Sequence, residues 1–97
     1  MTRNEVLAMK PGRELDALVA HQIFGVRDPD PRWSPSMNIY AAWEVEEEIN
    51  KRNLRVAYCQ ALQIVIRSQK DYVTTFDYVH ASPADRCKAA LLAVMEG

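Results

Sequence analysis

The stretch from Met9 to Gly25 specifies one helix whose two ends are both marked in the sequence. Pro11 fixes φ at a value suited to the first turn of a helix, and Gly25 can adopt the left-handed conformation that ends one. Between them, apolar residues recur at helical spacing, namely Leu15, Leu18, Val19 and Ile23. The sequence therefore predicts an amphipathic helix over residues 11–24 that buries one stripe and must pack against other elements.

Two further helices are predicted by similar signals. Ser36 is a suitable N-cap for a helix over residues 37–53, in which Trp43 lies in register with apolar neighbours and is expected to anchor the core. Ser82 followed by Pro83 marks the start of a last helix. Its expected buried stripe consists of Cys87, Ala90, Leu91, Val94 and Met95.

Between these helices the hydrophobic pattern changes period. Leu54, Val56 and Tyr58 occur at every second position, and so do Leu62, Ile64 and Ile66. Residues 72–79 are rich in aromatic, Val and Thr residues and indicate another strand. Residues 54–66 could form two strands or one long strand with a bulge. The predicted order is helix, helix, about three antiparallel strands, helix, which favours a single domain over residues 1–97, an α/β fold built as a three-layer α/β/α sandwich.

Composition limits the functional classes. The chain has 97 residues, of which 48% are hydrophobic, so one compact domain is expected. Twelve basic and 13 acidic residues nearly cancel, and the isoelectric point of about 6.1 does not suit a nucleic-acid-binding protein. Low net charge gives little self-repulsion and is compatible with a homo-oligomer.

The compartment expected from the sequence is a reducing cytosol. The two cysteines, Cys59 and Cys87, do not form a C-x-x-C pair. The first apolar residues are interrupted by polar ones, which does not fit a signal peptide, and no run reaches the length of a membrane span. We expect free thiols, no membrane association and no cofactor.

Three separated blocks together resemble a known family, the phage ABA sandwich domain, which comprises small phage-encoded proteins. The blocks are residues 9–20, residues 36–45 and residues 84–92. The resemblance implies an α-β-α sandwich, a phage or prophage origin and a function in the cytoplasm of a bacterial host. It transfers no catalytic motif. By analogy with other small phage proteins, it suggests counter-defence.

The strongest candidate site is a proline-stiffened loop over residues 27–36, where Arg27, Arg32 and Trp33 lie close in sequence and Tyr40 follows in the next helix. Arginine forks match phosphates, and aromatic rings can stack on a base. Arg13 adds a guanidinium near a helix start, where backbone N–H groups can bind an anion. The alternative is that Trp33 folds over the core as a lid, that the arginines solvate the loop, and that the helix start is simply capped.

Other chemistries are weakly indicated. His21 and His80 lack metal-ligand spacing, Cys59 is expected to be a small buried residue in a strand, and the acids of residues 44–48 are typical of a solvated helix face. The leading hypothesis is therefore non-enzymatic sequestration of a phosphorylated or nucleotide-like immune signal. The alternative is a protein-interaction inhibitor of a host defence enzyme or nuclease, with the acids of residues 44–48 imitating nucleic-acid charge. A small hydrolase is the third possibility.

Overall fold

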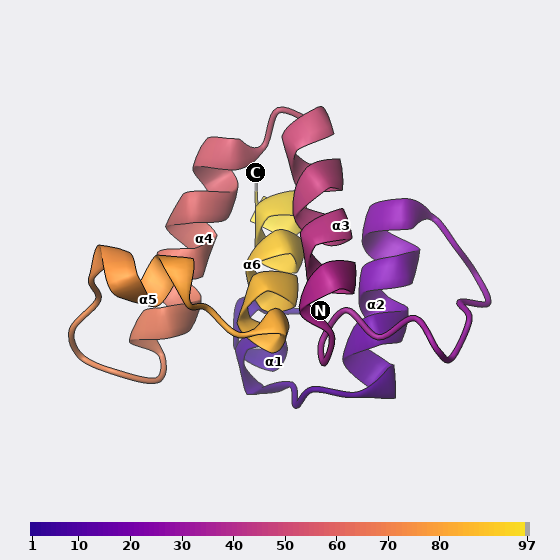
Figure 1. The fold of residues 1–97 in the computed structure, drawn as a ribbon, viewed down its shortest axis with the longest axis horizontal. Coiled ribbons are helices and arrows are strands. Elements are labelled where there is room, and N and C mark those ends of the chain that lie inside the picture. Colours follow the sequence, from indigo (N-terminus) through magenta and orange to yellow (C-terminus); the bar gives the residue numbers. More distant parts are fainter. Residues whose placement is uncertain (97) are drawn as a thin grey trace.

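The computed structural model describes residues 1–96, and all the regular elements within that span are helices. They are α1 (Arg3–Ala8), α2 (Arg13–Phe24), α3 (Ile39–Lys51), α4 (Arg55–Arg67), α5 (Thr75–Val79) and α6 (Pro83–Glu96). The expected three-layer α/β/α sandwich with a three-stranded sheet is therefore wrong for these residues. The domain is instead a bundle of helices with a short loop-borne helix, α5, at one side (Figure 1).

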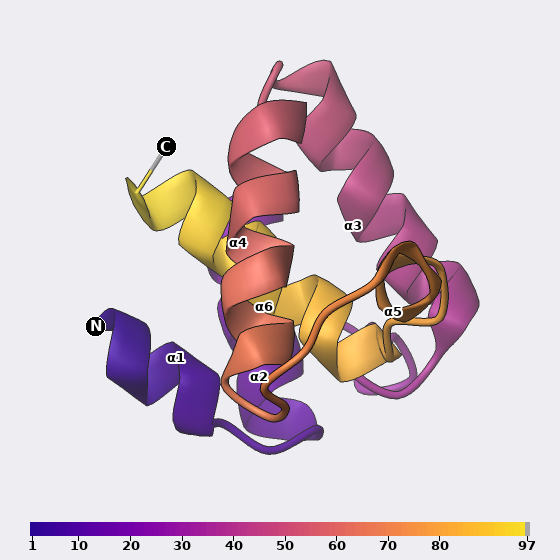
Figure 2. The same ribbon diagram turned by 90° about the vertical axis from the view of Figure 1, so that its left-hand side faces the viewer.

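Helix α6 forms the centre of the bundle. It contacts α1, α2, α3 and α4, and Figures 1 and 2 show it enclosed by these elements. Its residues are buried without a break from Cys87 to Ala93. Three of these residues are alanines, so neighbouring helices can approach the α6 backbone from several directions. The predicted stripe is thus confirmed at Cys87, Ala90 and Leu91, but Met95 is exposed and the buried surface extends around the helix.

Helix α4 occupies the residues that were expected to form one or two strands. Its buried positions have the spacing of a helix face, namely Tyr58, Ala61, Leu62, Val65 and Ile66. The alternation beginning at Leu54 fits a strand only locally, and Val56 is exposed. No Gly, Pro or Asn interrupts residues 54–67, so nothing in the sequence breaks a continuous helix that packs along α6.

The strand expected over residues 72–79 is also absent, and α5 takes part of its place. Thr74 precedes this helix and bonds to Asp77 in its first turn: the Thr74 N–H and hydroxyl donate to Asp77 Oδ2 at 2.8 and 3.1 Å, and the Asp77 N–H donates to the Thr74 carbonyl at 3.0 Å. Lys70 Nζ donates to Asp77 Oδ1 at 2.7 Å. These local bonds favour a helical turn over the extended conformation that the β-branched residues suggested.

The first two predicted long helices are confirmed with shifted starts. Helix α2 begins at Arg13 because Gly12 is in a non-helical conformation with φ 147°, and it ends at Gly25, whose φ of 66° is left-handed as expected. Helix α3 is capped by Asn38, which accepts the N–H of Tyr40 at 2.9 Å, whereas the predicted cap Ser36 bonds elsewhere. Trp43 is 48% exposed, so its predicted role as a core anchor is wrong.

The tight packing around α6 leads to a stability prediction. Ala90→Leu adds volume at a fully buried position, so we expect it to lower the free energy of unfolding by about 1–3 kcal/mol. Ala8→Leu, at an exposed position of α1, is the matched control and should change stability by less than about 0.5 kcal/mol. Chemical denaturation followed by circular dichroism measures both. Equal stability of the two variants would contradict the central packing of α6.

Candidate functional site

The proline-rich loop between α2 and α3 is fastened to α2 by a buried carboxylate. Asp16 is 7% exposed, and its two oxygens accept the Ser36 backbone N–H and the Ser34 hydroxyl, each at 2.8 Å. The Ser36 hydroxyl in turn accepts the Gly12 N–H at 2.9 Å. Residues 25–38 contain no regular helix or strand, as the prolines predicted, but these bonds give the loop a defined path back to α3.

An open hollow of about 390 Å³ is lined by residues of the loop, α2 and α3. Its apolar wall includes Phe24 of α2 and Val26, Pro29 and Trp33 of the loop, and Glu44 of α3 lies at its side. The rings of Phe24 and Trp33 stand perpendicular to one another, with centroids 5.5 Å apart. Trp33 is half-buried and packs against the core, as in the alternative in which it folds over the core, and it also lines the hollow.

A smaller hollow of about 230 Å³ shares Pro29, Asp30 and Trp33 with the larger one. Arg13 and Trp33 both line it, together with Asp16, Ala17 and Pro residues of the loop. The structure thus brings together two of the residues that the sequence proposed as a ligand site. It places carboxylates in the same hollow, however, since Asp30 also lines it.

The other predicted site residues are dispersed. Arg32 forms a paired contact with Asp30, with Nη2 2.9 Å from Oδ2 and Nε 3.2 Å from Oδ1, and this guanidinium holds the pKa of Asp30 below its usual value. Arg27 is exposed, and its backbone carbonyl accepts a hydrogen bond from His21 Nε2 at 2.7 Å. Tyr40 is 71% exposed and pairs edge-on with Trp43 instead of Trp33.

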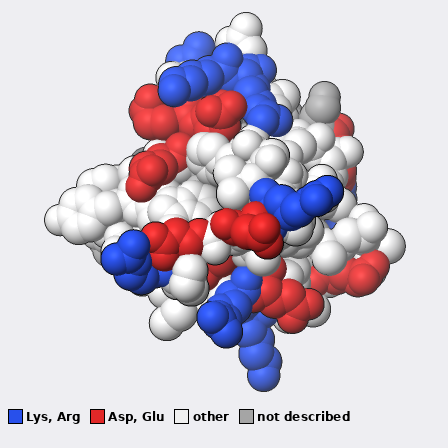
Figure 3. All heavy atoms as spheres, turned by 90° about the vertical axis from the view of Figure 1, so that its right-hand side faces the viewer, with Lys and Arg blue, Asp and Glu red and all other residues white. Residues whose placement is uncertain are grey.

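The surface around α2 and the loop has mixed charge. Figure 3 shows one basic group at the upper end of this face and acidic groups beside or between the other basic ones. Two of the predicted arginines have acidic neighbours: Arg32 is paired with Asp30, and Arg13 shares a hollow with Asp16 and Asp30.

Sequence reasoning missed the residues that shape the larger hollow, especially Phe24 and Glu44. From the sequence, Phe24 is only the last residue of the predicted helix over residues 11–24, and Glu44 is one acid of a predicted solvated helix face. A signal for Asp16 was present, because it lies between Leu15 and Val19 on the predicted buried arc of α2. A carboxylate at such a position needs hydrogen-bond partners, which here come from the loop.

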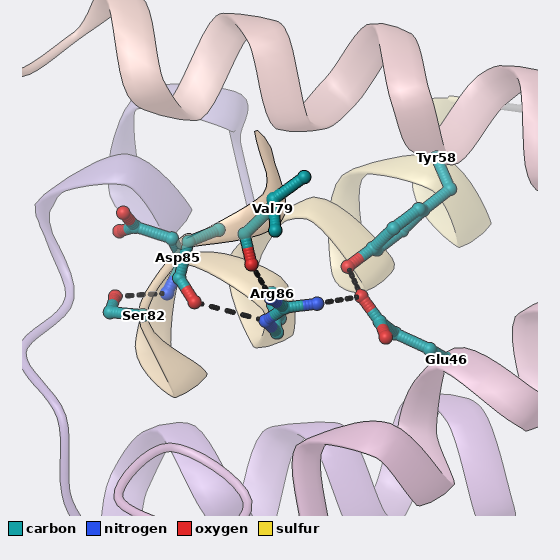
Figure 4. A network of polar contacts seen from close by, with 7 residues as sticks. Glu46, Tyr58, Val79, Ser82, Asp85 and Arg86 are labelled. Carbon is teal, nitrogen blue, oxygen red and sulfur yellow. Dashed lines mark hydrogen bonds and ion pairs between the residues drawn. The ribbon is translucent and has the colours of Figure 1, made fainter. Parts of the chain in front are cut away.

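A second polar cluster joins α3, α4 and α6 (Figure 4). Arg86 Nη1 donates to Glu46 Oε2 at 2.8 Å, and its other nitrogens donate to the carbonyls of Ala81 at 3.0 Å and Val79 at 2.9 Å. Tyr58 also donates its hydroxyl proton to Glu46, and burial raises the pKa of Tyr58 well above its usual value. Because every nitrogen of Arg86 is engaged, this cluster ties elements together and offers no free cation to a ligand.

The two thiols have opposite environments. Cys59 is exposed on α4, so its expected burial in a strand is wrong, whereas Cys87 is fully buried and burial raises its pKa to about 12. Among residues 1–96, no group of three or more His, Cys, Asp or Glu side chains is placed to hold a metal ion. None of the described helices has both the length and the apolar character needed to cross a membrane.

Comparison with known proteins identifies one family. The model of the phage ABA sandwich domain matches residues 5–91, which covers most of the chain and includes the loop and all the residues lining the larger hollow. No curated protein and no solved structure shows significant similarity to the chain.

The role of Asp16 can be tested by substitution. Asp16→Ala removes the acceptor of two buried bonds and leaves the Ser36 N–H without its partner, so we expect the free energy of unfolding to fall by about 2–3 kcal/mol. Asp16→Asn, which keeps one acceptor oxygen, should lose less. Asp28→Ala, in an exposed part of the same loop, is the control and should remain near wild type in urea denaturation. An unchanged midpoint for Asp16→Ala would exclude the fastening role.

The thiol environments predict selective labelling. In the native protein, Cys59 should react with a thiol-specific reagent such as DTNB, whereas Cys87 should react only after denaturation because it is buried and protonated. Cys59→Ser should abolish the rapid phase and Cys87→Ser should retain it. Rapid native labelling of the Cys59→Ser protein would show that α6 is less protected than the fold implies.

Proposed function

The chain belongs to the phage ABA sandwich domain family, and from this premise we propose that it is a phage accessory protein that acts by binding a host protein in the bacterial cytoplasm. The physiological role we propose is counter-defence through inhibition of a host defence enzyme or nuclease. The proposal assigns the chain no catalysis of its own.

The observation that carries the proposal is the exposed aromatic pair on α3. Tyr40 and Trp43 meet edge-on with ring centroids 5.5 Å apart and are 71% and 48% exposed. Large aromatic side chains that are held in place but remain accessible are enriched at protein interfaces, where they contribute much of the binding energy. Met37, which precedes α3 by two residues, is also 69% exposed.

Acidic side chains beside this pair support a partner with basic groups. Glu44 and Glu47 are exposed on α3, next to the aromatic residues in the helix register. The other two acids have structural contacts: Glu46 bonds to Arg86, and Glu48 pairs with Arg52 at 3.1 Å. The expected acidic flank over residues 44–48 is thereby reduced to two accessible carboxylates, which suits charge complementarity with a protein better than imitation of a nucleic-acid backbone.

Sequestration of a nucleotide-like signal is the second candidate. The hollow of about 230 Å³ that Arg13 and Trp33 share supports it, since it offers a guanidinium and a ring side by side. Two features weigh against it. Arg32 is already paired with Asp30, and the carboxylates of Asp16 and Asp30 line the same hollow, where they would repel a phosphate.

Native mass spectrometry of the protein, purified gently from bacteria with induced anti-phage signalling, tests the two candidates together. We expect a host protein to co-purify, and Trp43→Ala and Tyr40→Ala to reduce its recovery by about tenfold or more, because truncation of such anchors costs on the order of 1–2 kcal/mol or more. The same spectra report whether the chain forms the homo-oligomer that its low net charge favours.

Tyr72→Ala is the matched control, because Tyr72 is 76% exposed but lies outside α3. Equal loss in this variant and in Trp43→Ala would contradict a specific role for the α3 surface. A retained small molecule that is released on denaturation and lost in Arg13→Ala would favour sequestration instead.

A further inference from the structure

We propose that the hollow formed by Phe24, Trp33 and Glu44 is a binding site for a cationic side chain, a lysine or arginine presented by a protein partner. This inference rests on the proposed function, since it specifies the chemistry by which the partner is recognised. It concerns a different set of residues from the exposed aromatic pair of α3.

The shape of the site is set by two perpendicular rings. Phe24 and Trp33 stand at 90° to one another, so they form two walls of a corner inside a hollow of about 390 Å³. This volume is ample for one long side chain. The ring faces carry partial negative charge, and a cation placed against such a face is attracted to it, most strongly for Trp.

The electrostatics of the hollow favour a positive ligand. Glu44 and Asp30 are its charged lining residues, and no Lys or Arg lines it. Asp30 is neutralised by Arg32, but Glu44 makes no hydrogen bond or ion pair with any residue from 1 to 96. The accessible charge of the site is therefore a carboxylate beside aromatic walls, which complements an ammonium or guanidinium group and repels a phosphate.

The apolar lining favours a side chain with a hydrocarbon stem over a small inorganic cation. Ala20, Val26 and Pro29 complete the wall, and they can contact the methylene groups of Lys or Arg while the charged end meets Glu44. The site is also continuous with the proposed interface, because Glu44 lies one helical turn beyond Tyr40 on α3. A partner that covers Tyr40 can thus insert a basic side chain into the hollow.

The site is preorganised by the contacts that order the loop. The backbone N–H of Trp33 donates to the Asp30 carbonyl at 2.9 Å, and the Trp33 side chain packs against the core. Asp16 holds the following segment through its bonds to Ser34 and Ser36. Binding therefore requires little ordering of the loop, which reduces the entropic cost of taking up a ligand.

The test uses the whole protein and small probes, N-acetyl-arginine methylamide and N-acetyl-lysine methylamide, titrated in ¹H–¹⁵N NMR spectra. We expect the indole N–H signal of Trp33 to shift with saturation in the millimolar range, while that of Trp43 shifts much less. N-acetyl-citrulline methylamide has nearly the same shape as the arginine probe without its charge, and it should bind at least about threefold more weakly. Glu44→Gln should weaken the binding of both cationic probes by about two- to fivefold. Glu14→Gln changes an exposed acid of α2 that does not line the hollow and is not part of the proposed partner surface, so it should leave the binding of both probes unchanged.

Three outcomes would overturn the inference. Equal binding of the citrulline and arginine probes would show that charge is not recognised, and stronger binding of AMP than of either cationic probe would assign the hollow to an anionic ligand. Tighter binding of spermidine than of the amino-acid amides would assign it to a free polyamine. Failure of both cationic probes to bind would also contradict the inference, but a host protein could still be captured through Trp43. Conversely, the titrations need no host partner, so they can succeed even if no host protein co-purifies.

Discussion

The structure depends on the close packing of small residues along α6. A helix that contacts four others must present an apolar surface on most of its circumference, and its side chains must be small enough for the neighbouring backbones to approach. The buried run from Cys87 to Ala93 meets both needs, with Leu91 and Leu92 filling the space that the alanines leave. The only charged residue in this run, Lys88, is accommodated because its ammonium donates to the Leu7 carbonyl at the end of α1, at 3.0 Å. The charged group of Lys88 therefore helps to hold α1 against α6.

Once α2 and α3 are docked on α6, the loop between them determines the shape of the surface. A loop with three prolines between residues 27 and 36 cannot form a continuous ladder of backbone bonds, so its path is fixed by isolated turn bonds and by side chains. Asp16 does this from within α2, near the N-terminus of the helix, where a negative charge is also favoured. The consequence is that Trp33 is held against Phe24, and an aromatic hollow forms where a looser loop would leave an open surface.

The sequence predicts well where local signals are unambiguous. The left-handed stop at Gly25, the start at Ser82–Pro83 and the burial of Cys87 follow from capping and helical spacing alone. The prediction failed at residues 54–66 because Leu54, Val56 and Tyr58 satisfy a strand pattern over a short window, whereas the helical pattern from Tyr58 to Ile66 appears only over a longer one. The predicted burial of Trp43 is wrong for a different reason. The helix register places Trp43 at the edge of the apolar face of α3, and the packing of the neighbouring helices leaves that edge exposed. Of the residues that line the larger hollow, the sequence singles out Trp33 from the loop, whereas Glu44 and Phe24 come from elements whose relative placement the sequence does not specify.

The acidic residues of α3 show how helix geometry separates structural from accessible charge. Successive residues are 100° apart around the helix axis, so Glu46 and Glu48 flank the buried arc of Val45 and Ile49 on opposite sides. Each is half-buried and bonded to an arginine from another part of the chain or from the end of the helix. Glu44 and Glu47 point further from the core and are exposed. Because α2 and the proline-rich loop lie on the Glu44 side, that carboxylate borders an aromatic hollow while Glu47 remains in open solvent. Two carboxylates of the same helix therefore have different surroundings, since Glu44 has aromatic and apolar neighbours in the hollow and Glu47 does not line it.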